Sequence, residues 1–359
     1  MWRILGYILI TLVVLGLIGA FAITRGGKLV TPEGSGEVQI GDKTFEGMPL
    51  PDYEAKFVNE DNKSIFIEVE PVITVHMLEV GTGYPIYMQH GNPSSAFLYR
   101  KVVDELPLDR VRVIMPTLVG LGFSSKVPVK DHSVVNHNRW LNAALNELDL
   151  ESVIYVGQDW GGIVGIGAMS LSHELICGIV MMTSAIYSPT ENIDTTRLHE
   201  LVRTPIVGEL LIEVIFGPFD GMDGVQGDPE SMPPEVEQLY GRPVNESGNK
   251  KAPLALMRMV PHAPEHPSTA PMGELVTFVR SLDVPTEIVW GMNDPIGGDV
   301  LPAMQAHFPN ARTTETEAGH FLQEEVPDVI AAAVIRVYEE VHTLDLASVS
   351  EADPTQPLE

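Results

Sequence analysis

The sequence predicts an α/β fold in which a mostly parallel central sheet carries helices on both faces and an inserted helical cap. Short runs rich in β-branched and apolar residues alternate with helical patterns as far as Ser184, and this alternation is typical of parallel strands joined by helices. The alternation stops over residues 185–283, which are helix-prone and rich in proline, before a strand pattern returns. We interpret that interruption as the cap.

The strands are expected in two groups. Residues 64–70 and 73–80 have the pattern of two neighbouring antiparallel strands. Buried strands are expected at residues 85–89, 110–116, 152–157 and 178–184 before the cap, and at 285–291 and 312–317 after it. Apolar residues recur at helical spacing over residues 326–344, which predicts a closing helix.

These patterns divide the chain into six parts. We expect an N-terminal membrane anchor or signal segment (1–25), a polar linker (26–44), the first part of the core (45–184), the cap (185–283), the second part of the core (284–342) and a flexible acidic tail (343–359).

The N-terminal stretch from Ile4 to Thr24 contains 21 residues without a charge. As a helix it would be long enough to cross the roughly 30 Å hydrocarbon core of a bilayer. A cleaved signal peptide is the alternative, because Ala20, Phe21 and Ala22 offer a possible cleavage site, and a buried core helix is a weaker one. We therefore expect a membrane-anchored protein, or an exported one if the segment is cleaved. Positive charges on both sides leave the orientation undefined.

Composition narrows the function classes. Lys and Arg number 22 against 49 Asp and Glu, a net charge of −27, which repels the phosphates of nucleic acids. Cys177 is the single cysteine, so no intrachain disulfide can form. His262 and His266 have the spacing of a helical metal pair, but the prolines around them disfavour a helix, and we expect no metal site there.

The stretch VGQDWGG, residues 156–162, has the outline of a nucleophile elbow, a sharp turn between a strand and a helix. Asp159 stands at the position where most hydrolases with this turn have Ser. The glycines on either side allow a sharp turn and close packing of the helix on the strand. An Asp that merely caps a helix is the ordinary alternative.

Two more stretches fit the same chemistry. In HGNP, residues 90–93, the backbone N–H of Asn92 could join that of Trp160 in an oxyanion hole. His320 follows the last strand, where the histidine of a nucleophile, acid and histidine series is expected. We assign the acid to Asp294, in WGMNDPIGG, because the loop after the earlier strand offers only Thr183 and Ser184. A turn Asp before Pro295 is its ordinary alternative role.

Together HGNPSSAFLYR, PTLVGLGFSSK, VGQDWGG and AGHFLQEEVPD resemble the haloalkane dehalogenases, a branch of the α/β-hydrolase fold, over most of residues 45–342. The resemblance implies that Asp159 is the nucleophile, that His320 and Asp294 complete the triad, and that Asn92 and Trp160 bind halide. Thr117 departs from the family, which often has Asp there, and we expect a changed loop bond without a change of reaction.

Elementary chemistry agrees with this resemblance. A saturated carbon bearing a halogen offers no carbonyl and must be displaced by a nucleophile such as a carboxylate, which leaves an alkyl ester that water can hydrolyse. The expected partners are a small halogenated organic substrate, water and the halide product, without a cofactor. Three alternatives remain: an epoxide hydrolase using Tyr187 and Tyr240 of the cap, a haloacetate enzyme, which the lack of arginines near the elbow disfavours, and a membrane-tethered binding protein.

Overall fold

The structure is a computed structural model that describes residue 19 and residues 25–352. The predicted anchor Ile4–Thr24 therefore lies, apart from residue 19, outside the described residues. Within the described ranges we find no helix with both the length and the apolar character needed to cross a bilayer.

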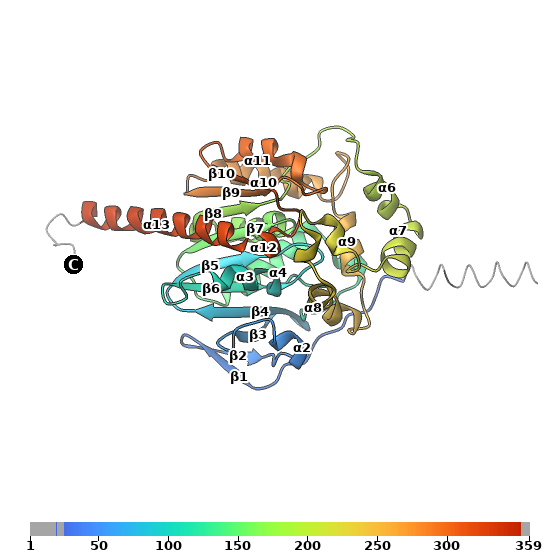
Figure 1. Cartoon of the computed structure of the whole chain (residues 1–359), viewed down its shortest axis with the longest axis horizontal. Coiled ribbons are helices and arrows are strands. Elements are labelled where there is room, and N and C mark those ends of the chain that lie inside the picture. The colour runs from blue at the N-terminus through green and yellow to red at the C-terminus, as the bar shows by residue number, and fades with distance from the viewer. Residues whose placement is uncertain (1–18, 20–24, 353–359) are drawn as a thin grey trace, which may run out of the picture.

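One sheet of ten strands organises the molecule, in the order β1-β2-β3-β4-β6-β5-β7-β8-β9-β10 (Figure 1). Neighbouring strands run antiparallel from β1 to β6 and parallel from β6 to β10. The strands are β1 (Glu37–Ile40), β2 (Lys43–Gly47), β3 (Lys63–Glu70), β4 (Ile73–Gly81), β5 (Tyr84–Gln89), β6 (Val111–Pro116), β7 (Val153–Gln158), β8 (Ile176–Met182), β9 (Thr286–Gly291) and β10 (Arg312–Thr316). All eight predicted strands are confirmed, with ends that differ by no more than two residues.

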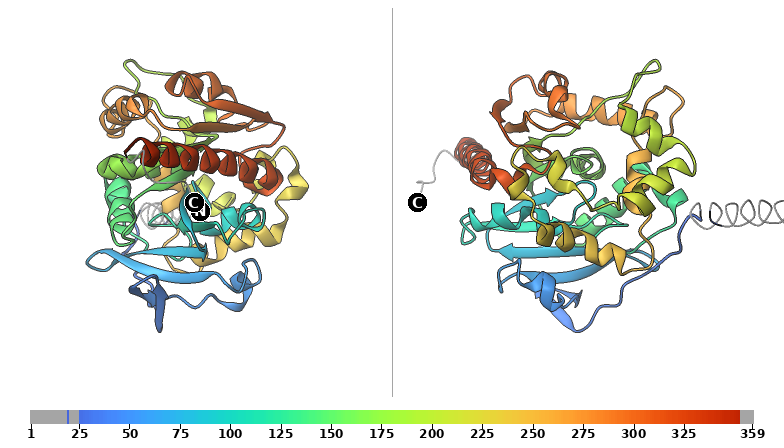
Figure 2. Two further views of the ribbon diagram at one scale, coloured as in Figure 1. Left: turned by 90° about the vertical axis from the view of Figure 1, so that its left-hand side faces the viewer. Right: turned by 45° about the vertical axis from the view of Figure 1, so that its right-hand side comes forward.

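Helices cover both faces of this sheet (Figure 2). On one face α3 packs against α13, which also contacts β8 and β9, and on the other α4 packs against α5. The core helices are α2 (Asp52–Ala55), α3 (Arg100–Asp104), α4 (Val134–Asn146), α5 (Ile166–Met169), α11 (Leu301–His307), α12 (Leu322–Glu325) and α13 (Pro327–Ala352). Fully buried strand residues such as Ile86, Val156 and Ile288 fill the space between the layers. The predicted mostly parallel sheet with two helical layers is confirmed.

Between β8 and β9 the described chain forms helices and loops instead of strands, in agreement with the predicted helical cap. Most of these helices lie beyond the carboxyl ends of the parallel strands, whereas the last of them, over residues 269–281, contacts the core helices α4 and α11 (Figure 1). The cap helices are α6 (Arg197–Arg203), α7 (Val207–Glu209), the π-helical η5 (Leu210–Ile215), the short 3-10 helices η6 (Met222–Val225) and η7 (Pro229–Ser231), α8 (Pro234–Asn245), α9 (Ala252–Arg258) and α10 (Thr269–Ser281).

The predicted linker over residues 26–44 is wrong in its second half, where β1 and the start of β2 form a hairpin on the edge of the sheet. Val38 and Ile40 alternate with polar residues, and Val38 pairs with Phe45 across the hairpin. Gly41 turns the chain with φ of 57°, a conformation that glycine adopts without strain. The polar composition of residues 26–44 conceals this short alternation, which spans only four residues in β1.

The predicted flexible tail over 343–359 is also wrong in part, because α13 continues to Ala352. Residues 343–352 lack Gly and Pro, the residues that most disfavour a helix, so nothing in this stretch interrupts α13.

Candidate active site

Asp159 lies on a strained turn at the carboxyl end of β7. Its φ of 51° is unusual for a residue other than glycine, and a helical turn follows directly at Gly161–Gly165. The end of β8 holds the turn: the N–H of Asp159 donates to the carbonyl of Thr183 at 3.1 Å, and the hydroxyl of Ser184 donates to the carbonyl of Asp159 at 2.8 Å. A Cβ on Gly161 would collide with the carbonyl of Gln89, so the turn requires glycine there. The geometry is that of a nucleophile elbow.

Backbone amides hold the carboxylate of Asp159. The N–H of Asn92 donates to Oδ1 at 2.7 Å, and the N–H of Trp160 also donates to this carboxylate. The loop after β5 approaches so closely that a Cβ on Gly91 would overlap the Asp159 side chain. The two amides predicted to form an oxyanion hole therefore converge on one carboxylate.

His320 and Asp294 lie on the other side of that carboxylate. Nε2 of His320 is 3.8 Å from Oδ2 of Asp159, and Nδ1 is 2.9 Å from Oδ2 of Asp294. The second oxygen of Asp294 accepts the N–H of Ile296 at 2.7 Å, which fixes the buried carboxylate. The structure thus brings the three predicted residues into one chain of contacts, from loops after β7, β9 and β10.

Burial and charge shift both ends of this chain. Burial raises the pKa of Asp159, although His320 and the two amides oppose that shift. For His320, burial lowers the pKa, but the neighbouring carboxylates of Asp294 and Asp159 outweigh it, so the net pKa is raised. The Asp159 side chain is 20% exposed, whereas that of Asp294 is fully buried, so a small molecule can reach the first carboxylate and not the second.

Asn92 and Trp160, whose backbone amides contact Asp159, are also the predicted halide ligands. Trp160 is 4% exposed, and the amide nitrogen of Asn92 donates to the carbonyl of Pro253 in α9 at 3.2 Å. Because a side-chain amide carries two N–H groups, one remains available for another acceptor. The contact with Pro253 connects this predicted halide ligand to the cap.

The sequence did not indicate that a cap segment also grips the histidine loop. The N–H of His320 donates to the carbonyl of Val225 at 2.8 Å, and Gln226 exchanges two hydrogen bonds with the backbone of Phe321. Glu325 accepts N–H groups from Gly227, Asp228 and Gly319. Gln226 and Phe321 lie 95 residues apart in the chain, so no local pattern predicts their contact.

Other predicted candidates lie apart from these contacts. The rings of His262 and His266 are 5.1 Å apart, and among the described residues no three His, Cys, Asp or Glu side chains form a metal-binding group. The hydroxyl of Tyr187 donates to the carbonyl of Pro261 at 2.9 Å. Tyr240 is fully buried, and its hydroxyl donates to Glu324 at 2.5 Å.

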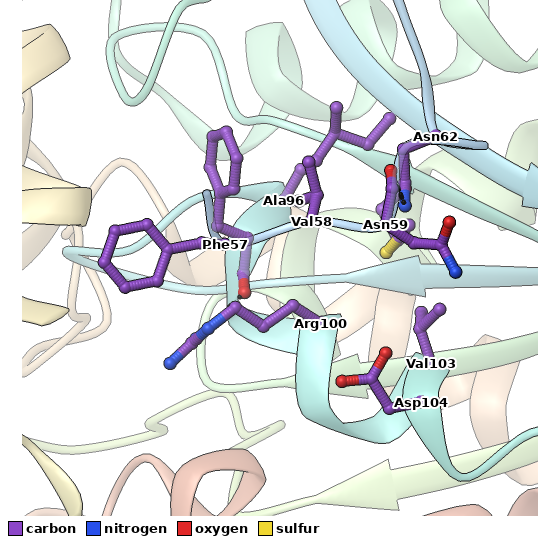
Figure 3. A pocket seen from close by; sticks show the side chains of 11 residues that line it. Phe57, Val58, Asn59, Asn62, Ala96, Arg100, Val103 and Asp104 are labelled. Atoms are coloured by element: carbon purple, nitrogen blue, oxygen red, sulfur yellow. Dashed lines mark hydrogen bonds between the residues drawn. The ribbon is translucent and has the colours of Figure 1, made fainter. Parts of the chain in front are cut away.

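A small cavity beside α3 is separate from the candidate site. Phe57, Val58 and Asn59 line it on one side and Arg100 on the other (Figure 3). None of the five predicted site residues lines this cavity.

Thr117 is the residue at which this chain differs from the haloalkane dehalogenases, which often have Asp there. Its hydroxyl accepts the N–H of Ala96 at 3.1 Å and lies 3.4 Å from Nδ1 of His76. Thr117 therefore makes a hydrogen bond that holds the loop before α3. That the reaction is unchanged stays a prediction.

Known proteins similar to this chain share its fold. The family model described as the alpha/beta hydrolase fold matches residues 84–204. A cis-3-alkyl-4-alkyloxetan-2-one decarboxylase from Shewanella oneidensis is 26% identical over 278 residues, covering 75% of this chain and 86% of the relative. A haloalkane dehalogenase 2 from Mycobacterium tuberculosis is 27% identical over 264 residues, covering 73% and 90% respectively.

Solved structures of other proteins have a fold similar to that of this chain. A point mutant of the haloalkane dehalogenase DatA from Agrobacterium tumefaciens C58 is 25% identical, covers 80% of this chain and 99% of its own, and superimposes with a TM-score of 0.68. The sheet, the elbow and these matches identify the chain as an enzyme of the α/β-hydrolase fold. Within that fold, its resemblance to the haloalkane dehalogenases is confirmed.

Proposed function

We propose that this enzyme hydrolyses haloalkanes to an alcohol, a halide ion and a proton through a covalent ester on Asp159. One observation carries the proposal: a carboxylate, in place of a serine hydroxyl, occupies the elbow, with Oδ1 held by the N–H of Asn92 and Oδ2 facing His320. A carboxylate can displace a leaving group from saturated carbon.

In the first step Oδ2 of Asp159 forms a bond to the carbon and the carbon–halogen bond breaks with its electron pair on the halide. The departing halide gains negative charge, and the second N–H of Asn92 and the indole N–H of Trp160 are neutral donors for it. Hydrogen bonds to a charged acceptor contribute about 1.5 to 3 kcal/mol each, enough to affect the rate of this step.

In the second step water attacks the ester carbonyl and transfers a proton to Nε2 of His320. The oxyanion forms on Oδ1, to which the N–H of Asn92 already donates, and the N–H of Trp160 donates to the same carboxyl group. Asp294, 2.9 Å from Nδ1, stabilises the imidazolium and selects the tautomer with a free Nε2. The ester C–O bond then breaks, and the departing alkoxide takes the proton from Nε2 of His320 and leaves as the alcohol. The carboxyl group of Asp159 loses the remaining proton to solvent, which restores the carboxylate.

The structure weakens the epoxide hydrolase alternative. That reaction needs two cap tyrosines with hydroxyls free to polarise the epoxide oxygen. The hydroxyl of Tyr187 donates a hydrogen bond to a cap carbonyl, and that of the buried Tyr240 is hydrogen-bonded to both Glu324 and Arg100. A conservative test is Tyr187→Phe, which we expect to leave dehalogenation within about twofold.

A second candidate, supported by the Shewanella relative, is decarboxylation of a β-lactone. Asp159 would attack the saturated ring carbon that bears the ring oxygen. The ring oxygen would leave as part of a carboxylate held by Asn92 and Trp160. Loss of carbon dioxide would then form a carbon–carbon double bond and expel Asp159. This route consumes no water, so it does not require His320 as a base.

Halide release by the full chain on chloro-, bromo- and iodoalkanes, beside epoxide and β-lactone panels, tests these alternatives. We expect His320→Phe to release one halide per enzyme and accumulate protein heavier by the alkyl group, and Asp159→Ala to do neither. Normal turnover by Asp159→Ala would refute the proposal. Alkene formation from the lactone that survives in His320→Phe would favour the second candidate, and a chain silent on all panels would favour a binding protein.

A further inference from the structure

The outer side of the cap exposes an unusual concentration of apolar side chains. We define the cap face as Leu198, Leu201, Ile206, Val214, Ile215 and Phe216, which come from α6 and from residues 206–216, the stretch that contains α7 and η5. Val214, Ile215 and Phe216 are 59%, 62% and 58% exposed. Single exposed apolar residues are ordinary, but a group on neighbouring helices marks an interaction surface.

The charges of this helical stretch point the opposite way. Glu209 and Glu213 are buried and pair inside the cap, Glu209 with Arg258 through two bonds of 2.7 and 2.9 Å and Glu213 with Lys251 at 2.5 Å. A helix on a water-exposed surface normally buries its apolar side and exposes its charges. Here the arrangement is reversed, although the chain as a whole carries a net charge of −27.

The cap face also lies beside the point where the predicted membrane segment joins the domain. The carbonyl of Gly26 accepts the N–H of Val129 at 2.7 Å, and the carbonyl of Lys28 accepts from Asn249 at 2.6 Å. The next residue, Lys250, donates to the carbonyl of Glu213 in η5 at 2.8 Å. The start of the continuous described chain accordingly reaches α7 (Figures 1 and 2).

These attachments leave almost no free chain. Between Thr24, where the uncharged stretch ends, and Gly26, where the chain is hydrogen-bonded to the domain, there is one residue. Two residue steps span at most about 7 Å, and apolar faces of peripheral helices enter roughly 5 to 10 Å into a bilayer. If Ile4–Thr24 crosses the bilayer, this side of the cap has to lie at the membrane surface.

We propose that the cap face is embedded in the interfacial layer of the same lipid bilayer that the N-terminal segment crosses. The bilayer covers the exposed apolar side chains, and the inward pairing of Glu209 and Glu213 keeps their charges out of the lipid. The enzyme thus lies flat against the membrane on its cap, with the opposite ends of the parallel strands facing water.

The full chain, reconstituted in phosphatidylcholine vesicles, tests this proposal. With Cys177 replaced by Ala, a polarity-sensitive fluorophore is attached at Ile215→Cys or, as a matched control, at Leu171→Cys. Ile215 and Leu171 are 62% and 59% exposed. Leu171 lies just before β8, at the amino ends of the parallel strands, whereas the cap face lies beyond their carboxyl ends. Lipids carrying a quencher near the headgroup are then added in increasing amounts.

We expect a blue-shifted emission at position 215 and quenching at least fivefold stronger than at position 171. Phe216→Cys, 58% exposed, provides a second site if the first label disturbs folding. Equal quenching at 215 and 171 would overturn the proposal, as would a chain that does not sediment with vesicles. A blue-shifted emission at position 215 that quencher lipids leave unchanged would also overturn it. The cap face would then be covered by another copy of the chain or by the N-terminal segment.

Discussion

The contact between His320 and Asp294 gives the most direct test of the proposed mechanism. Asp294→Asn keeps the size of the side chain, and its remaining oxygen can still accept the N–H of Ile296. The change removes the negative charge 2.9 Å from Nδ1 of His320. In addition, an amide can donate to Nδ1 and so select the tautomer in which Nε2 is protonated and cannot accept a proton from water.

The magnitude follows from the lost charge. A charge-assisted bond to an imidazolium contributes about 1.5 to 3 kcal/mol, so the hydrolysis of the Asp159 ester should slow about 10- to 150-fold. The pH profile should change as well. Asp294 is the largest contribution that raises the pKa of His320, and burial, which lowers it, remains. The variant should therefore keep a neutral His320 to lower pH, and its rate deficit should narrow as the pH falls.

Stopped-flow mixing with a brominated alkane separates the two steps. We expect Asp294→Asn to give a halide burst close to that of the parent enzyme and a slow steady state. Asp299→Asn, the same substitution at an exposed position five residues on, serves as the control and should leave both phases unchanged. Steady-state rates and a pH profile identical to the parent would refute the assignment of Asp294 as the acid.

Three further predictions follow from the same geometry. Asn92→Ala should slow the alkylation step about 10- to 100-fold and ester hydrolysis less, because the backbone N–H survives; equal effects on both steps in single-turnover mixing would contradict this. His320→Phe removes a charge that lowers the pKa of Asp159, so the acid limit of the halide burst should move to higher pH, and an unmoved limit would contradict it. Burial lowers the pKa of Lys126 to about 7 in the folded protein, against an ordinary value of 10.5. Between these pH values the unfolded chain holds more protons, so stability should rise with pH by up to about 1.4 kcal/mol per unit, and urea unfolding of Lys126→Met should lack that rise.

Much of the fold could be predicted because its signals are local. Buried parallel strands appear as short apolar runs, and the loop that follows each strand necessarily reaches the same edge of the sheet. That rule placed Asp159, Asp294 and His320 on three loops at one edge. In the structure His320 lies between the other two, 2.9 Å from Asp294 and 3.8 Å from Asp159. Their catalytic roles stay predictions until the variants are measured.

The features that escaped prediction depend on distant parts of the chain. The hairpin of β1 and β2 is stabilised by pairing with β3, which the polar sequence of residues 37–44 does not reveal. The inward turn of Glu209 and Glu213 depends on Arg258 and Lys251, which lie 49 and 38 residues later. Helical periodicity shows which residues share a face, but not which face meets the protein.

The contacts of the cap place a constraint on how substrate reaches Asp159. On one side, Gln226 holds the backbone of Phe321 and Glu325 joins Gly227 to Gly319, so opening the cap there would displace the loop that carries His320. That displacement would break the 2.9 Å contact with Asp294. The cap segment over residues 225–228 and the histidine loop therefore behave as one unit. Substitutions in that segment should alter ester hydrolysis, although none of its side chains needs to contact the substrate.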